Sequence, residues 1–496
     1  MSRSTMATAP PSAGPRWVLP LLASTQFVLI LDAAIVIVAM PSMARDLGFT
    51  PSGLSWVANA YVLLFGGFLL LGGRVGDLIG RRRTFILGVL VFAAASLAGA
   101  LAQEPLWLVA ARAGQGLAAA FVSPSALALL LVSLAEGPER NRALGVWGAV
   151  GATGGAVGGL VGGTLTEWLG WASVLYVNVP IGLAVASLAP RVLPTGDRGT
   201  VDSGKFDVAG AMTITAGIGA GIYAVVDADD AGWGSMQTLC LLAAAASLLA
   251  MFVIVEKRAK NPLVPLGVFA DRGFTVANGV AVLNTMAMFP TFFLLTLYLQ
   301  AVLGFTPLQA GLGFLPLSLA LLVGTLNGSR AVQRFGARTT MATAVATTAV
   351  GLAWFGFLSA GGSVLADVIG PSILTGLGAG VAWTASSIAA TGGSSERDAG
   401  LRSGVLIASQ QVGGAIGLGA IVAVAASVSG AATEPATYAY GLGAGMWTAA
   451  AVAAVAAALT LWLAPSATAA WHAPSDVHEN EGGSTTASRT RRTSGS

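Results

Sequence analysis

The sequence has very few of the residues that metal sites, disulfides and soluble surfaces require. It contains one cysteine, Cys240, and two histidines in 496 residues. These counts exclude an intrachain disulfide and a cysteine-based metal site. Charged residues make up only 9% of the chain, whereas soluble domains carry about 25%. We therefore expect an integral membrane protein that has no bound metal and no other cofactor.

Other kinds of chemistry are missing as well. No glycine-rich phosphate loop ending in Lys-Ser or Lys-Thr is present, and no hydrolase triad is recognisable. The apolar runs hold no pair of carboxylates, no histidine cluster and no nucleophile beside a base. We therefore expect neither ATP-driven transport within this chain nor an enzyme, and no nucleic-acid partner.

Long apolar runs dominate what the sequence does contain. Hydrophobic residues make up 55% of the chain, and a helix that crosses about 30 Å of hydrocarbon needs roughly 20 of them in succession. This length predicts an all-α fold with fourteen transmembrane helices. The predicted helices begin near Trp17, Leu54, Thr84, Leu106, Arg142, Trp171, Phe206, Met236, Phe274, Leu308, Thr339, Val364, Ser403 and Gly441.

The basic residues test this helix count. When the N-terminus is placed in the cytoplasm, all but two of the 25 Lys and Arg residues fall in cytoplasmic loops or tails. The exceptions are Arg112, inside a span, and Arg45, in an external loop. Such a bias satisfies the positive-inside rule and predicts that both termini are cytoplasmic. The preference for Arg over Lys, with 66 glycines, resembles high-GC bacterial coding, so we expect a bacterial cytoplasmic membrane.

Two motifs occur twice at nearly the same distance. Residues 79–82 are echoed by 335–338 at an offset of 256, and residues 139–145 by 398–404 at an offset of 259. Duplicated halves with a site between them are typical of secondary transporters. We predict six-helix bundles over 17–189 and 274–464, joined by 190–273, which holds cytoplasmic loops and two extra helices. The tails are 1–16 and 465–496, and the second has a disordered composition.

Two ionisable side chains lie well inside the predicted spans. Asp32 is about 15 residues into the first helix and Arg112 is in the fourth, next to Gln115. A charge at the bilayer centre costs about 2.5–3.5 kcal/mol on insertion scales, so each needs a reason to be there. Asp32 either makes a helix-packing hydrogen bond or carries a proton or contacts substrate. Arg112 stays charged, so it either holds neighbouring helices together through an ion pair or carbonyl contacts, or it influences the pKa of the carboxylate.

Glycine-rich segments form a second group of candidates. In the fifth helix, Gly158, Gly159, Gly162 and Gly163 have spacings that allow close helix packing, a gating bend, or both. The loop that begins at Gly72 contains Gly73, Asp77, Gly80, Arg81 and Arg82, which anchor the membrane side or form a latch between helices. In the second copy of this loop Gln333 stands opposite Asp77, so we expect only the first copy to act as a latch.

Polar and aromatic side chains inside the spans are candidates for lining a substrate cavity, although each occurs more often in helix packing. They are Gln26, Asn59, Tyr61, Asn178, Asn284, Trp354, Trp383 and Gln410.

Together these motifs resemble the major facilitator superfamily, and within it the fourteen-helix drug/proton antiporters, over roughly residues 17–464. The family's loop motif is matched by Gly73, Asp77, Gly80, Arg81 and Arg82, with Leu78 in place of a basic residue. Its first-helix signature is matched around Leu31-Asp32, with Ala34 and Ile37 in place of Thr and Asn. Its fourth-helix motif is matched by Arg112, Gln115 and Gly116, and its fifth-helix motif by residues 158–163, with Gly159 in place of proline. Residues 176–182 also resemble this subfamily.

The resemblance implies proton-coupled efflux of lipophilic drugs, antibiotics or toxic natural products by alternating access. The expected partners are a small lipophilic substrate, protons and membrane lipid, and the expected state is a monomer. By this resemblance, Asp32, Arg112 and Gln115 would couple substrate transport to proton movement. The loop would stabilise one conformation by linking helix ends. Two other functions stay open: uptake by proton symport, which the missing proline of the fifth helix permits, and a non-transporting membrane sensor or scaffold.

Overall fold

The computed structural model describes residues 17–134, 138–194, 207–259, 262, 264–392, 396–430 and 434–464, so both predicted tails lie outside the described residues. All regular structure in these ranges is helical, with no β-strand. The earlier helices are α1 (Val18–Leu47), α2 (Pro51–Ile79), α3 (Arg81–Ala100), α4 (Pro105–Ser133), α5 (Pro138–Leu169), α6 (Ser173–Tyr176), α7 (Asn178–Val192), α8 (Val208–Ala231) and α9 (Met236–Arg258). The later ones are η2 (Leu266–Ala270), α10 (Arg272–Leu297), η3 (Tyr298–Val302), α11 (Pro307–Gly313), α12 (Leu315–Phe335), α13 (Ala337–Phe355), η4 (Val364–Ile369), α14 (Gly370–Thr391), α15 (Glu396–Ser429) and α16 (Pro435–Leu463).

Helix ends follow from local side-chain chemistry. Asp271 caps α10, because its carboxylate accepts hydrogen bonds from the backbone N–H groups of the first turn. Thr306 and Gln309 form a reciprocal capping box at the start of α11, with Pro307 at the first helical position. Gly48 ends α1 in the left-handed region, with φ of 74°. These signals divide a nearly continuous apolar sequence into separate helices.

Each of the fourteen predicted spans coincides with a helical segment. Ten of the segments, within the described residues, are long and apolar enough to cross a membrane. The protein is therefore a multi-pass integral membrane protein. The predicted and observed first residues differ most for α15, which begins at Glu396 rather than near Ser403. The helix extends beyond its apolar part into the polar residues before it.

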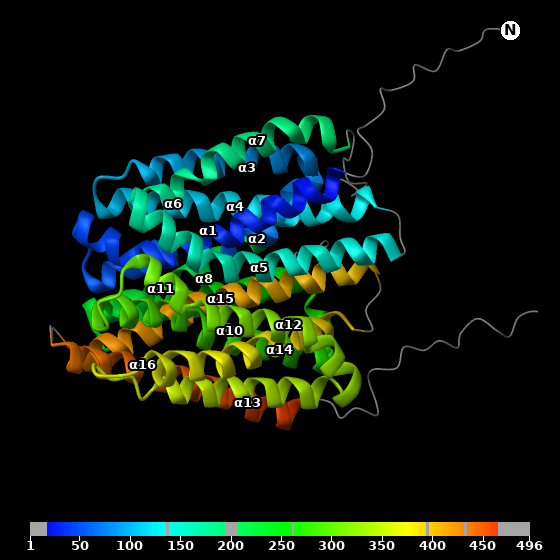
Figure 1. Ribbon diagram of the computed structural model, residues 1–496. Coiled ribbons are helices and arrows are strands. Elements are labelled where there is room, and N and C mark those ends of the chain that lie inside the picture. The colour runs from blue at the N-terminus through cyan, green and yellow to red at the C-terminus, as the bar shows by residue number, and fades with distance from the viewer. Residues whose placement is uncertain are drawn as a thin grey trace, which may run out of the picture.

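The helices pack as two similar groups, which run across the upper and lower parts of Figure 1. In the first bundle (α1–α7), α2 and α3 pack on α4, and α1 packs on α5. In the second bundle (α10–α16), α12 and α13 pack on α14, and α10 packs on α15. The remaining helices, α8 and α9, pack on each other, and α8 also contacts α2 and α15 across the two bundles.

Glycine allows the same close backbone approach in both bundles. A Cβ added at Gly116 of α4 would lie 2.2 Å from the carbonyl oxygen of Tyr61 in α2. A Cβ added at Gly376 of α14 would lie 2.4 Å from the carbonyl oxygen of Leu317 in α12. Small residues at such crossings are typical of membrane helices. Gly116 and Gly376 are 260 residues apart, close to the offsets of the sequence repeat.

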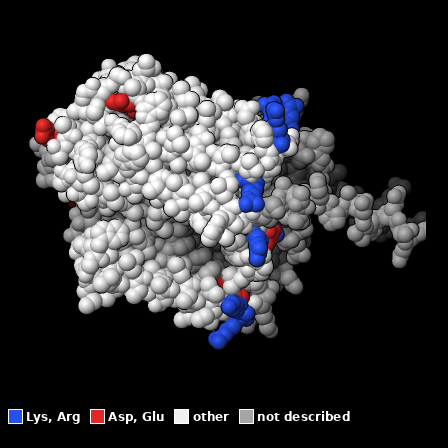
Figure 2. Space-filling view, turned by 90° about the horizontal axis from the view of Figure 1, so that it is seen from below, with Lys and Arg blue, Asp and Glu red and all other residues white. Residues whose placement is uncertain are grey.

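Basic side chains gather at one end of the molecule, which we call the arginine-rich end (Figure 2). There, Arg82 donates to the carbonyl oxygen of Pro190 near the end of α7, at 2.5 Å. In the second bundle, Arg338 donates to the carbonyl oxygen of Leu461 near the end of α16. Each arginine follows a glycine with positive φ, Gly80 at 104° and Gly336 at 77°, that separates two helices. The repeated loop therefore makes the same helix-end contact twice.

Candidate functional site: a buried carboxylate in the first bundle

Asp32 lies in the interior of the first bundle and is 0% exposed. Its Oδ2 is 2.6 Å from Nη1 of Arg112, which α4 supplies and which is equally inaccessible to solvent. Removing two charges from water costs several kcal/mol per ion, and their attraction offsets this only when the remaining polar atoms are also hydrogen-bonded. The neighbours of this ion pair therefore decide whether it is stable.

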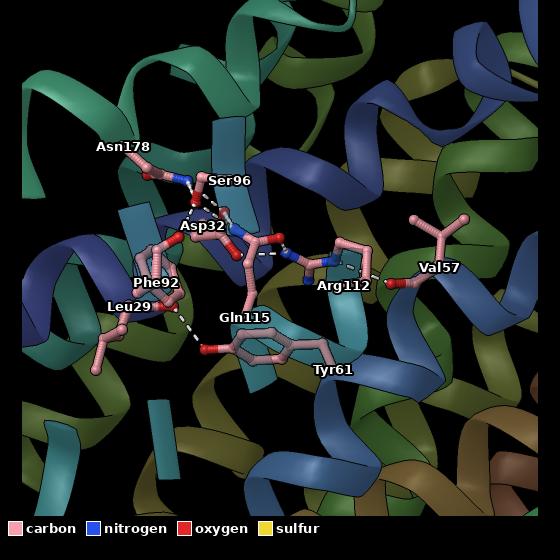
Figure 3. Close-up of polar contacts among 9 residues, drawn as sticks. All are labelled: Leu29, Asp32, Val57, Tyr61, Phe92, Ser96, Arg112, Gln115 and Asn178. Atoms are coloured by element: carbon pink, nitrogen blue, oxygen red, sulfur yellow. Dashed lines mark hydrogen bonds and ion pairs between the residues drawn. The ribbon is translucent and has the colours of Figure 1, made fainter. Parts of the chain in front are cut away.

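Three side chains complete the surroundings of the Asp32 carboxylate (Figure 3). Its Oδ1 accepts hydrogen bonds from Nδ2 of Asn178 at 2.6 Å and from Nε2 of Gln115 at 3.1 Å. Ser96 Oγ accepts from Nε2 of Gln115 at 2.7 Å and donates to a backbone carbonyl of its own helix. Both carboxylate oxygens thus accept hydrogen bonds from side chains of α4 or α7, and Ser96 of α3 holds one of these donors in place.

Arg112 is held just as firmly on its other side. Its Nε donates to the carbonyl oxygen of Val57 in α2 at 3.0 Å, and its Nη1 donates to Oε1 of Gln115 at 2.9 Å. The guanidinium carbon lies 4.5 Å from the centre of the Tyr61 ring, a cation–π distance. The hydroxyl of Tyr61 donates to the carbonyl oxygen of Leu29. The pair therefore joins α1, α2 and α4 into one unit.

This arrangement can change its charge in only one way. A carboxylate can take up a proton, whereas a guanidinium stays charged in proteins. A proton on Asp32 would remove the negative partner and leave Arg112 as an uncompensated buried cation. The free energy of the packed bundle is therefore sensitive to the protonation of Asp32.

The structure brings together Asp32, Arg112 and Gln115, which the sequence selected for proton coupling. It adds Asn178, Ser96, Val57 and Tyr61. Asn178 and Tyr61 are among the residues that the sequence predicts to line a cavity, and in the structure they contact the ion pair. Ser96 gave no usable signal, because serines in helices commonly bond to their own backbone. Val57 contributes only a backbone carbonyl, which no side-chain motif can indicate.

The glycines of α5 have two packing partners. Added Cβ atoms at Gly158 and Gly162 would lie 2.4 Å from Ala34 Cβ and 2.8 Å from Ile35, both in α1 of the same bundle. The neighbouring glycines face the second bundle: an added Cβ at Gly163 would lie 2.4 Å from the carbonyl oxygen of Pro307 in α11. In the same way, an added Cβ at Gly159 would lie 3.2 Å from Phe314 Cβ. One helix thus packs closely within its own bundle and across to the other.

The remaining candidates are dispersed. In the loop motif, an added Cβ at Gly73 would make only ordinary contact, with Pro124 at 3.7 Å. Arg81 begins α3 beside Arg82, and the side chain of Asp77 lies outside the described residues, so the proposed latch stays a prediction.

The other polar residues predicted to line a cavity differ in burial. Gln26 accepts from Ser123 at 3.5 Å, Trp383 is 45% exposed, and Gln410 is buried beside Thr285. Asn59 and Asn284 are buried with unpaired polar atoms: both amide atoms of Asn59 and Oδ1 of Asn284 have no partner. Among the described residues, no three His, Cys, Asp or Glu side chains lie close enough to hold a metal ion.

Comparisons with known proteins agree with this architecture. The profile of the Major Facilitator Superfamily matches residues 22–417. The chain is 40% identical to the cephamycin export protein CmcT of Amycolatopsis lactamdurans, over 85% of this chain and 87% of that protein. It is 39% identical to the puromycin resistance protein of Streptomyces alboniger, over 84% and 82%.

A solved structure shows the same fold at low sequence identity. It is a bacterial homologue of the human lysosomal transporter Spinster, crystallised in an inward-facing, unoccupied conformation. The TM-score is 0.66 at 15% identity, covering 92% of this chain and 98% of the other. The fold, the profile match and the similarity to export and resistance proteins show that this chain belongs to the Major Facilitator Superfamily.

Proposed function

We propose that this protein exports a small lipophilic molecule from a bacterial cytoplasm in exchange for protons. The relatives that support export are named for cephamycin export and puromycin resistance. The observation that carries the proton coupling is the buried Asp32–Arg112 pair, because protonation of its carboxylate is the one charge change available there.

The proposed topology has fourteen transmembrane spans, with the arginine-rich end in the cytoplasm. Six spans come from each bundle, where α6 with α7, α10 with η3, α11 with α12 and η4 with α14 each cross as one unit. The other two spans are α8 and α9. The positive-inside rule supports the orientation, and it places the ends of α1 and α5 and the start of α11 on the outside.

In this proposal the two bundles move against each other and expose a central site to each side in turn. A proton that reaches Asp32 neutralises the acceptor of Arg112, Gln115 and Asn178 and so loosens the contacts of α1 with α4 and α7. Proton entry is favoured electrically by about 2.3 kcal/mol per charge per 100 mV of membrane potential. That term is similar in size to a charged hydrogen bond of about 1.5–3 kcal/mol, so one proton is enough to shift the equilibrium.

The same geometry limits the substrate. Both oxygens of Asp32 are already occupied and the side chain is fully buried. The other buried carboxylate among the described residues is that of Glu256, which binds the backbone N–H of Val264 at the arginine-rich end. Since neither buried carboxylate of the described part of the chain is free to pair with a cation, we propose substrates that are neutral or weakly charged and are recognised by apolar, aromatic and amide groups.

The test measures proton release from inverted vesicles when substrate is added, with puromycin and a cephamycin as probes. Asp32→Asn should abolish substrate-induced proton release while insertion in the membrane stays normal. Asp46→Asn is the matched control, because Asp46 lies in the same helix and is exposed, and it should behave as wild type. Wild-type proton release by the Asp32→Asn variant would contradict the proposal.

A further inference from the structure

The two bundles are joined by side-chain hydrogen bonds at the end opposite the arginine-rich end. There, α5 of the first bundle packs on α11 of the second, and the two helices lie side by side in Figure 1. Two glycines make this contact close: an added Cβ at Gly311 would lie 2.4 Å from the carbonyl oxygen of Gly159. Backbone contact of this kind brings polar groups of one bundle within reach of the other.

Glu167 uses this proximity. It is exposed near the end of α5, and its Oε2 accepts a hydrogen bond from the backbone N–H of Leu308 at 2.9 Å. Leu308 belongs to the first turn of α11, whose N–H groups have no partner within the helix. A carboxylate on such a donor forms a charge-assisted hydrogen bond, which is stronger than one between neutral groups. This bond therefore ties the end of α5 to the second bundle.

Gln300 makes a second bond between the bundles. Its Nε2 donates to the carbonyl oxygen of Val38 in α1 at 2.9 Å. Gln300 lies in the π-helical segment η3, and π-helical turns occur often at functional positions. The bond thus places an amide donor of the second bundle opposite a backbone acceptor in α1 of the first bundle.

We propose that Glu167 and Gln300 form an external latch that holds the outer side of the transporter closed. The proposal rests on the export function and topology proposed above, and it adds a specific gate remote from Asp32. The latch consists of two hydrogen bonds with backbone partners, so it depends on the approach of the helices and not on the substrate. Opening to the outside must break both bonds, and each therefore favours the outward-closed state.

Asn59 destabilises the outward-closed state that the latch favours. It is 0% exposed in α2, and neither atom of its amide has a hydrogen-bond partner. In the same helix, an added Cβ at Gly66 would lie 2.8 Å from Cβ of Gln411 in α15, so α2 packs closely on the second bundle. An unpaired buried amide destabilises the state that buries it. The two bonds of the latch offset this cost in the outward-closed state.

The test measures the distance between the two bundles by pulsed electron–electron double resonance. Spin labels are placed at Trp168→Cys and Leu312→Cys, which are exposed positions in α5 and α11, after the native thiol is removed by Cys240→Ser. In liposomes, Glu167→Ala should increase the ratio of long to short distances at least about fivefold, which is the effect of one hydrogen bond of ordinary strength, because the bond that it removes is charge-assisted. Gln300→Leu should act in the same direction.

Two controls separate the hydrogen bond from the charge. Glu167→Gln keeps an oxygen that can accept from Leu308 but loses the charge, so its ratio of long to short distances should lie between those of the parent and of Glu167→Ala. Glu104→Ala removes an exposed carboxylate whose side chain does not cap its own helix, α4, and should also leave the distances unchanged. An unchanged distribution for Glu167→Ala, or an equal shift for Glu104→Ala, would overturn the latch. The measurement needs neither substrate nor a proton gradient, so its failure is distinguishable from failure of the export function.

Discussion

The two bundles have the same packing but very different interiors. The close crossing at Gly116 of α4 has its counterpart at Gly376 of α14. Counting back from each glycine, Arg112 corresponds to Ser372 and Gln115 corresponds to Thr375. In the first bundle these residues form a hydrogen-bonded ion pair with Asp32, whereas the hydroxyls of Ser372 and Thr375 are buried without a partner.

The fold alone therefore does not require the charges. One helix scaffold accepts an ion pair in one copy and neutral, unpaired hydroxyls in the other. The function therefore depends on side chains placed on a shared scaffold. We infer that the first bundle responds to protons, while the second serves mainly as the rigid partner against which it moves.

The largest expected effect comes from removing the cation of the first bundle. Arg112→Ala would leave Asp32 as an uncompensated buried charge, a change that costs about 3–5 kcal/mol. We expect a markedly lower thermal unfolding temperature in detergent and loss of transport. Ser372→Ala, at the corresponding position of the second bundle, should leave both unchanged. Equal destabilisation by the two variants would remove the distinction between the bundles.

A smaller effect is expected for the amide donor to Asp32. Asn178→Leu removes a hydrogen bond to a charged group, which contributes about 1.5–3 kcal/mol, so the export rate should fall roughly tenfold or more. The matched variant is Asn284→Leu, since Asn284 is a buried asparagine of the second bundle whose carbonyl oxygen is unpaired. Export assays on both variants check this contrast, and normal export by Asn178→Leu would show that the carboxylate does not need this donor.

The arginines of the repeated loop should behave alike. Arg82→Ala and Arg338→Ala each remove one exposed contact to a backbone carbonyl at the end of α7 or α16. We expect similar losses of stability in thermal unfolding, of no more than about 1 kcal/mol each. A much larger loss of transport for Arg82→Ala alone would indicate that the first copy of the loop has the additional latch role predicted from Asp77.

The smallest effect concerns the unpaired hydroxyl of α14. Thr375→Val replaces it with a methyl group of similar size, and removal of an unpaired buried polar group is neutral or stabilising by up to about 1 kcal/mol. Ser96→Ala in the first bundle should instead destabilise by about 1 kcal/mol, because Gln115 loses its acceptor. Thermal unfolding of the two single variants, with opposite expected signs, measures this directly.

The sequence predicted the helices well because apolar length and charge placement are strong signals in a membrane protein. It also selected Asp32, Arg112 and Gln115, because a charge inside an apolar run is costly and therefore conspicuous. Proximity was harder to predict. Asn178 is 146 residues from Asp32 along the chain, and only the packing of α7 beside α1 and α3 brings them together.

The contacts between the bundles could not be predicted for a related reason. Glu167 binds a backbone N–H and Gln300 binds a backbone carbonyl, and neither partner has a side-chain signature. The second copy of the loop also has an arginine, Arg338. Because Gln333 stands there in place of Asp77, the sequence predicts that this copy does not act as a latch. In the structure the part that both copies keep, a glycine with an arginine two residues after it, makes the same contact in each.

Export in exchange for protons depends, in our proposal, on Asp32 as the group that carries the proton. The most direct measurement compares two activities of purified Asp32→Asn in liposomes: substrate exchange at equilibrium and substrate accumulation driven by a pH gradient. We expect exchange to persist while gradient-driven accumulation is lost, because the neutral amide cannot take up a proton. Gradient-driven accumulation at the wild-type level would show that Asp32 does not carry the proton.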